Sequence, residues 1–274
     1  MDKKRANRFD ALFDKLLSTD KSIADLQTLG ESPNAVEFAT FLTTKYLDLQ
    51  ALEMMYKQKL LPALREAHRE NIRDARYSRY KEFISFEQEP TEDIDEWVRY
   101  GYVQLFHKYE SFHRGFIKRL DELYLDILDG RESISEFILK RWHIKIADQW
   151  RLDPVVWASN YVTICVKHHD GFPKADGGDK PWVPHRFRKL DPALKLSFEP
   201  NEFYADINHI MKWEQTFVQI LIGIQNLRLA EPLLAEEPVG QKAIEARFKI
   251  LQGRVALEHL MLDFRERIAE SQKA

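Results

Sequence analysis

Apolar residues recur every three or four positions through long stretches of this sequence, and no stretch alternates apolar and polar residues for the length of a strand. The first pattern is typical of amphipathic helices, and the missing second pattern is typical of half-buried strands. The stretches are separated by Ser-Pro, Asp-Pro and Glu-Pro-Thr sequences, which begin helices rather than continue them. We therefore predict an all-α fold, arranged as an antiparallel bundle of long helices.

The breaks between these stretches predict where each helix begins and ends. The expected helices cover residues 4–17, 33–86 with an interruption at Pro62, 91–128, 133–146, 154–168, 200–229 and 240–268. Before the last two helices, residues 169–200 hold five Pro and three Gly, which predicts one long irregular loop. We expect residues 1–274 to form one helical domain, with a sub-boundary near residues 88–91 that separates 1–88 from 91–274.

Composition favours a cytoplasmic globular protein. Hydrophobic residues make up 44% of the chain, which is enough for a core, and the formal net charge of −3 provides no global basic field for nucleic acid. The single cysteine, Cys165, cannot form an intrachain disulfide, which favours a reducing compartment. The N-terminus lacks the apolar core of a signal peptide, and the most apolar stretch, 216–224, is too short to span a bilayer.

One helix end carries residues suited to phosphate chemistry. Asn160, Lys167 and His168 fall near one helical face, since seven residues make about two turns. Histidine exchanges protons near neutral pH, and lysine can stabilise a developing phosphate charge. We take Asn160, Lys167, His168 and Asp170 as candidate catalytic residues for metal-independent and cofactor-independent phosphodiester chemistry. The alternative interpretation is a polar helix terminus, whose cations interact favourably with the helix dipole.

The stretch Asn160-x6-Lys167-His168-x-x-Gly171 resembles the motif helix of HEPN-like proteins, the higher-eukaryote and prokaryote nucleotide-binding helical superfamily. The upstream segment 108–124 resembles the partner helix of such bundles, and the resemblance covers about residues 97–172. It implies an α-helical bundle that often dimerises, in a group rich in ribonucleases of toxin–antitoxin and phage-defence systems.

The resemblance also directs attention to the partner helix. It adds candidate substrate-binding residues on that helix, namely His113, Arg114 and Lys118. Two more candidates, His169 and Lys174, follow Lys167-His168 in the chain. The ribonuclease signature of the family, Arg followed four to six residues later by His, is absent before His168. One formal match, Arg254-x4-His259, lies in the last expected helix.

The leading functional hypothesis is a HEPN-like protein that binds or cleaves RNA or nucleotide in a prokaryotic defence or toxin–antitoxin setting, with a metal-independent endoribonuclease as its catalytic form. The alternative is a non-catalytic module that binds a protein partner. We also expect a homodimer or a stable complex, because an apolar stripe continues nearly to the tip of helix 91–128. That stripe consists of Phe112, Phe116, Leu120, Leu123 and Ile127.

A dimetal oxidoreductase is a further alternative. Glu110-x-x-His113 and Asp206-x-x-His209 each place a carboxylate and an imidazole one turn apart, as in four-helix carboxylate metal proteins. Glu53 and Glu136 would then supply the two single carboxylates that such a site requires.

A basic row forms the last notable pattern. It consists of Arg65, Arg69, Arg73 and Arg76, followed by Tyr77, Arg79 and Tyr80. Arginine with interleaved tyrosine can contact phosphates and stack on bases. Acidic residues interrupt the row, which favours a solvated face with intrahelical ion pairs. Those acids are Glu66, Glu70 and Asp74.

Overall fold

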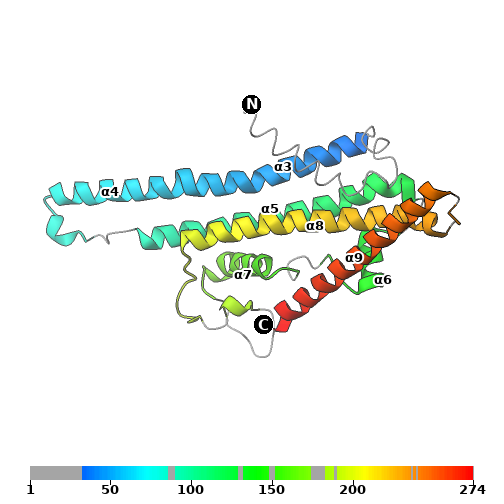
Figure 1. Ribbon diagram of the computed structural model, residues 1–274. Helices are drawn as coiled ribbons and strands as arrows, with labels where there is room; N and C mark the ends of the chain where they lie inside the picture. Colours follow the sequence, from blue (N-terminus) through cyan, green and yellow to red (C-terminus); the bar gives the residue numbers. More distant parts are fainter. Residues whose placement is uncertain are drawn as a thin grey trace. The chain divides into compact units, whose positions relative to one another are not determined.

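The computed structural model describes residues 33–85, 90–128, 132–147, 152–173, 183–187, 190–235, 237–238 and 240–273. None of these residues lies in a strand, so the predicted all-α class is confirmed (Figure 1). The helices are α3 (Pro33–Met55), α4 (Leu61–Tyr77), α5 (Thr91–Leu128), α6 (Ile134–Trp142), α7 (Pro154–His169), α8 (Pro200–Ala235) and α9 (Gln241–Lys273). The helix expected over 4–17 lies outside the described residues.

The interruption expected at Pro62 is confirmed as a π-turn, Tyr56–Leu60, between α3 and α4. Proline has no N–H for the carbonyl four residues earlier and its ring clashes there, so the helix widens by one residue just before it. Pro62 then occupies the first turn of α4, where the missing N–H costs little.

Other boundaries are shifted from the predictions. α5 has the predicted limits, but α4 ends at Tyr77 instead of near 86, and a 3-10 turn, Lys81–Phe83, follows. α6 ends at Trp142 instead of near 146, because His143 adopts a left-handed φ of 58°. α8 and α9 run several residues longer than predicted.

The described residues form two compact units. The first comprises the described residues within 33–45, 111–153 and 212–273, and the second comprises those within 46–110 and 154–211. Helices α3, α5 and α8 contribute residues to both units. The region 88–91 lies within the second unit.

In the first unit, the apolar stripe of α5 is covered by other helices of the same chain. The Phe116 ring lies 5.7 Å from that of Phe38 on α3 and 6.0 Å from that of Phe217 on α8. Phe116 and Leu120 are fully buried and Phe112 is 4% exposed. Each such burial stabilises the fold by roughly 1.5–3 kcal/mol. The expectation that a second chain must cover these three residues is therefore wrong, while the side chain of Ile127 lies outside the described residues.

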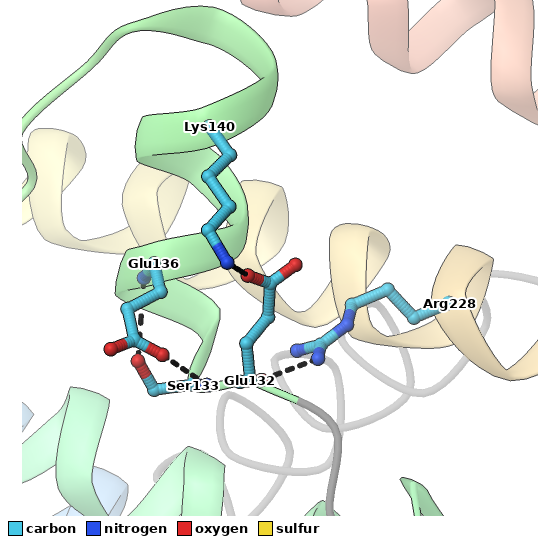
Figure 2. Close-up of polar contacts among 5 residues, drawn as sticks. All are labelled: Glu132, Ser133, Glu136, Lys140 and Arg228. Atoms are coloured by element: carbon cyan, nitrogen blue, oxygen red, sulfur yellow. Dashed lines mark hydrogen bonds and ion pairs between the residues drawn. The ribbon is translucent and has the colours of Figure 1, made fainter.

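The start of α6 is fixed by side chains of the first unit, as Figure 2 shows. Ser133 caps the helix by accepting from the Glu136 N–H at 3.3 Å, and Glu136 in turn accepts from the Ser133 N–H, which completes a capping box. Lys140 pairs with Glu132, and the buried guanidinium of Arg228 on α8 donates to the Glu132 carbonyl. These contacts join α6 to α8.

In the second unit, a partly buried polar cluster attaches the long loop to α5 and α8. Tyr102 on α5 donates to Asp206 on α8 at 2.6 Å, and Arg186 from the short turn His185–Phe187 donates to the same oxygen at 2.8 Å. Burial, followed by the charge of Asp206, raises the pKa of Tyr102, so its hydroxyl remains a donor. Apart from that turn, the described residues between 170 and 199 are irregular, as predicted.

Candidate functional site

Helix α7 presents the candidate catalytic residues at its C-terminal end. Its inner face is apolar and buried, and it includes Val156, Trp157, Val162 and Cys165. The last turn carries Lys167, His168 and His169, and the positive charge of Lys167 suits the negative end of the helix dipole. The packed inner face therefore holds a cationic turn on a fixed helix.

The end of α7 is defined by Asp170 and Gly171, both of which have positive φ, 52° and 81°. The Gly171 N–H donates to the Cys165 carbonyl at 3.0 Å, six residues back, and so satisfies one of the last carbonyls of the helix. A Cβ added at Gly171 would also come within 3.1 Å of the Arg99 side chain. Gly171 is thus favoured by its left-handed backbone conformation and by the close approach of the Arg99 side chain.

Arg99 of α5 joins this helix end to the loop that precedes α8. Its guanidinium is buried and donates to the Leu196 carbonyl at 2.8 Å, and the Leu196 N–H donates to the Gly171 carbonyl at 2.9 Å. Because Arg99 is only 7% exposed, it acts as a positioning residue that fixes the end of α7.

Exposed side chains suited to proton transfer lie where α7 contacts α5. Lys167 and His168 are exposed, and the Lys167 ammonium contacts Nε2 of His107 on α5. An ammonium can only donate, so Nε2 accepts and the proton of a neutral His107 ring lies at Nδ1. That Nδ1 is 3.9 Å from a carboxylate oxygen of Glu110. We call His107, Glu110 and Lys167, together with the exposed His168 that follows Lys167 in the chain, the α5–α7 polar group.

The remaining predicted residues of the motif helix lie on α7 or directly after its end. The Asp170 side chain is 86% exposed and pairs with Lys195 at 3.1 Å. Asn160 and His169 are half-buried on α7. Lys174 lies outside the described residues.

The residues predicted on the partner helix belong to the other unit. His113 is 1% exposed, donates from Nε2 to the Ile146 carbonyl at 2.7 Å, and stacks on Phe217 with ring centres 4.6 Å apart. Burial lowers the pKa of His113 from 6.5 to about 4, so the ring is neutral at pH 7. Arg114 and Lys118 are exposed, and Lys118 pairs with Glu122 at 3.6 Å.

Sequence reasoning missed His107, Arg99 and Lys195. His107 and Glu110 are three residues apart on α5, a spacing that could have directed attention to them. Their partner Lys167 is 60 residues away in sequence, however, and only the packing of α7 on α5 reveals that contact.

The dimetal arrangement is not assembled in the described part of the chain, where no group of three or more His, Cys, Asp or Glu could hold a metal ion. One oxygen of Asp206 already accepts from Tyr102 and Arg186, and Glu53 contacts Asn208 at 3.4 Å. Nε2 of His113 already donates a hydrogen bond to the Ile146 carbonyl, so it carries a proton and has no lone pair for a metal.

The formal Arg254-x4-His259 match lines a shallow surface groove of about 380 Å³ on α9. Glu258 lies between them in sequence and accepts from Arg141 and from the Trp142 indole at 2.9 Å. Burial alone would raise the pKa of Glu258, but these hydrogen bonds and the nearby arginine charges lower it below its ordinary value. Glu258 therefore serves to hold α9 against α6.

Comparison of the chain with protein-family models, with curated proteins and with solved structures finds no match. Within the described ranges, no helix has both the length and the apolar character needed to cross a membrane.

Proposed function

We propose that this protein is a HEPN-like protein that binds RNA or nucleotide phosphates at the α5–α7 polar group, and that it cleaves RNA there without a metal. The observation that carries the proposal is an exposed imidazole, His107, in contact with the Lys167 ammonium at a helix end fixed by Arg99 and Gly171. Proton-transfer groups beside a fixed cation are what phosphodiester cleavage requires. The prokaryotic defence or toxin–antitoxin setting belongs to the same proposal and is supported by the HEPN-like pattern of residues 160–171.

Cleavage of a phosphodiester needs three roles, which His107, His168 and Lys167 would fill. One histidine, His107 or His168, takes the proton of a ribose 2′-hydroxyl as its oxygen attacks the adjacent phosphorus. The other histidine gives a proton to the departing 5′-oxygen, so the products are a 2′,3′-cyclic phosphate and a 5′-hydroxyl. Lys167 stabilises the negative charge that develops on the phosphoryl oxygens. The balance needs no oxidant, water or metal in this step.

The test is incubation of the full chain with total RNA in the presence of a chelator. We expect cleavage by the wild type and a loss of rate of roughly 10²–10⁴-fold for His168→Ala, the range for removal of a general acid or base. His209→Ala, an exposed histidine of α8 in the same unit, serves as the control and should behave as wild type. Equal activity of all three proteins, or no binding and no cleavage by the wild type, would refute the proposal.

A second candidate function, self-association through α9, is favoured by an exposed apolar stripe. Its side chains are 42–60% exposed and follow the spacing of a helix–helix seam, namely Ile244, Phe248, Leu251, Val255 and Leu262. The opposite face of α9 is buried, with Ile250, Leu257 and Met261 below 9% exposure. The same seam on a second copy supplies a matching apolar surface, so we propose a homodimer.

Light scattering at micromolar concentration tests this second candidate. A dimer has twice the 32.5 kDa chain mass, and Val255→Glu should return it to the monomer mass by placing a charge in the seam. Gln252→Glu, one turn earlier but outside the stripe, is the matched control. A wild-type monomer at these concentrations would rule out self-association.

A further inference from the structure

The end of α4 and the turn after it expose aromatic side chains to an unusual degree. Phe83 and Tyr77 are 87% and 86% exposed, the highest values among the large hydrophobic side chains of the described residues, and Tyr80 is 53% exposed. Only Leu61, at the opposite end of α4, is buried in this helix. In Figure 1, the last turns of α4 extend past the starts of α5 and α8, which belong to the same unit.

These rings are not required by the core. Exposed aromatic surface is unfavourable in water, and a cluster of it marks an interaction surface more often than an isolated residue does. Tyr77, Tyr80 and Phe83 fall within seven consecutive residues, so the exposure is concentrated in one short segment. We call Arg73–Phe83 the α4 tip.

The backbone of the α4 tip is held by its own hydrogen bonds. The Ser78 N–H donates to the Ala75 carbonyl at 3.1 Å, and the Ser78 hydroxyl accepts from the Tyr80 N–H at 3.1 Å. The Phe83 N–H donates to the Tyr80 carbonyl at 2.9 Å. The rings are therefore presented from a fixed turn, which lowers the entropy lost when they bind a partner.

Cations alternate with the rings along the α4 tip. Four cations, Arg73, Arg76, Arg79 and Lys81, outnumber its two carboxylates, Asp74 and Glu82, although the whole chain is net negative at −3. The Arg79 guanidinium lies 4.7 Å from the centre of the Tyr80 ring. Earlier in α4, Arg69 pairs with Glu66 at 3.1 Å. Within the described ranges, Arg76 and Lys81 make no ion pair.

We propose that the α4 tip binds single-stranded RNA, with bases stacked on Tyr77, Tyr80 and Phe83 and phosphates contacted by Arg76, Arg79 and Lys81. The inference rests on the proposed function and deepens it, because it gives the RNA a second contact surface separate from the α5–α7 polar group. Single-stranded RNA is the ligand that uses both features at once, since unpaired bases expose flat faces between regularly spaced charges. Duplexes hide those faces, and apolar protein partners would leave the cations unused.

The experiment measures binding of a fluorescent single-stranded oligouridine to the full chain by anisotropy, in chelator and at several salt concentrations. The double variant Tyr77→Ala/Phe83→Ala should weaken binding at least about fivefold for each ring removed. Tyr100→Ala, an exposed tyrosine of α5 in the same unit, is the matched aromatic control and should bind as wild type. Arg76→Glu/Arg79→Glu should reduce the slope of log affinity against log salt by about 0.7 for each phosphate that the variant no longer neutralises, whereas Arg265→Glu on α9 should leave it unchanged.

The outcomes separate this inference from the proposed function. If the wild type binds oligouridine and both α4 variants bind equally well, the α4 tip is not an RNA surface, and the α5–α7 site is unaffected by that result. If the α4 variants lose binding while His107→Ala and Lys167→Ala do not, the inference stands and the proposed site is wrong. Loss of binding to vesicles with anionic lipid, with oligouridine binding unchanged, would identify a membrane surface and overturn the inference. No oligouridine binding by the wild type would refute both.

Discussion

Acidification should destabilise this protein through His113, a histidine that the fold keeps neutral. Its ring is 1% exposed, lies against Phe217 and donates to the Ile146 carbonyl, and burial lowers its pKa from 6.5 to about 4. The unfolded chain takes up a proton below pH 6.5, whereas the folded chain does so only near pH 4. The stability contributed by the neutral ring is therefore present above pH 6.5 and is lost as the pH falls toward 4.

The magnitude follows from the two pKa values. At 1.36 kcal/mol per pKa unit, lowering the pH from 7 to 5 should cost the folded state about 2 kcal/mol through this one side chain. Other groups titrate in the same interval, so the comparison is made with His113→Gln, which keeps an N–H donor but binds no proton.

The assay is urea unfolding followed by tryptophan fluorescence at pH 7 and pH 5. His113→Gln should be less stable than wild type at pH 7, because it loses the stacked ring, but its free energy of unfolding should fall by about 2 kcal/mol less on acidification. If wild type and variant lose equal free energy between the two pH values, His113 is not buried as a neutral ring. A substrate-binding role for His113 would then become physically reasonable again.

Three substitutions in the second unit test the packing that supports the site, each by urea unfolding at pH 7. Tyr56→Phe removes a buried hydroxyl that has no hydrogen-bond partner in the described structure, so it should raise the free energy of unfolding by about 1 kcal/mol; a loss would indicate a bound water. Gly101→Val should lower it by about 1–3 kcal/mol, because even a Cβ there would lie 2.5 Å from the Phe203 ring, and an unchanged value would contradict that packing. Tyr102→Phe should lower it by about 1.5–3 kcal/mol, because Asp206 loses a donor; no loss would show that Arg186 alone satisfies the carboxylate.

Local signals predicted the helices well because they act within one turn. Pro62 forced an interruption and Pro90-Thr91 marked the start of a helix, since proline chemistry acts on neighbouring residues. The early end of α6 was missed because His143 adopts a left-handed conformation that is uncommon for a residue other than glycine. The left-handed C-terminus at Gly171 was recognisable, since glycine is common at such positions.

Contacts between distant segments were not predictable from one sequence. His113 and His107 both follow apolar residues on the same helix, yet one is buried under α8 and the other contacts Lys167. The side that each histidine faces is decided by the helices packed around it within its own unit. For the same reason, the sequence predicted that a second chain covers the stripe through Phe116. In the structure, Phe38 of α3 and Phe217 of α8 lie against that ring.

The most direct test of the central claim is ultraviolet crosslinking of single-stranded RNA to the full chain, followed by identification of the crosslinked peptides. The account predicts crosslinks in two places, one in the peptides that contain His107 or residues 160–171 and the other in residues 73–83. The first group should disappear in His107→Ala/Lys167→Ala, while the second remains. Crosslinks confined to α9, or no crosslinks above those of an unrelated protein of similar charge, would contradict RNA binding at the α5–α7 polar group.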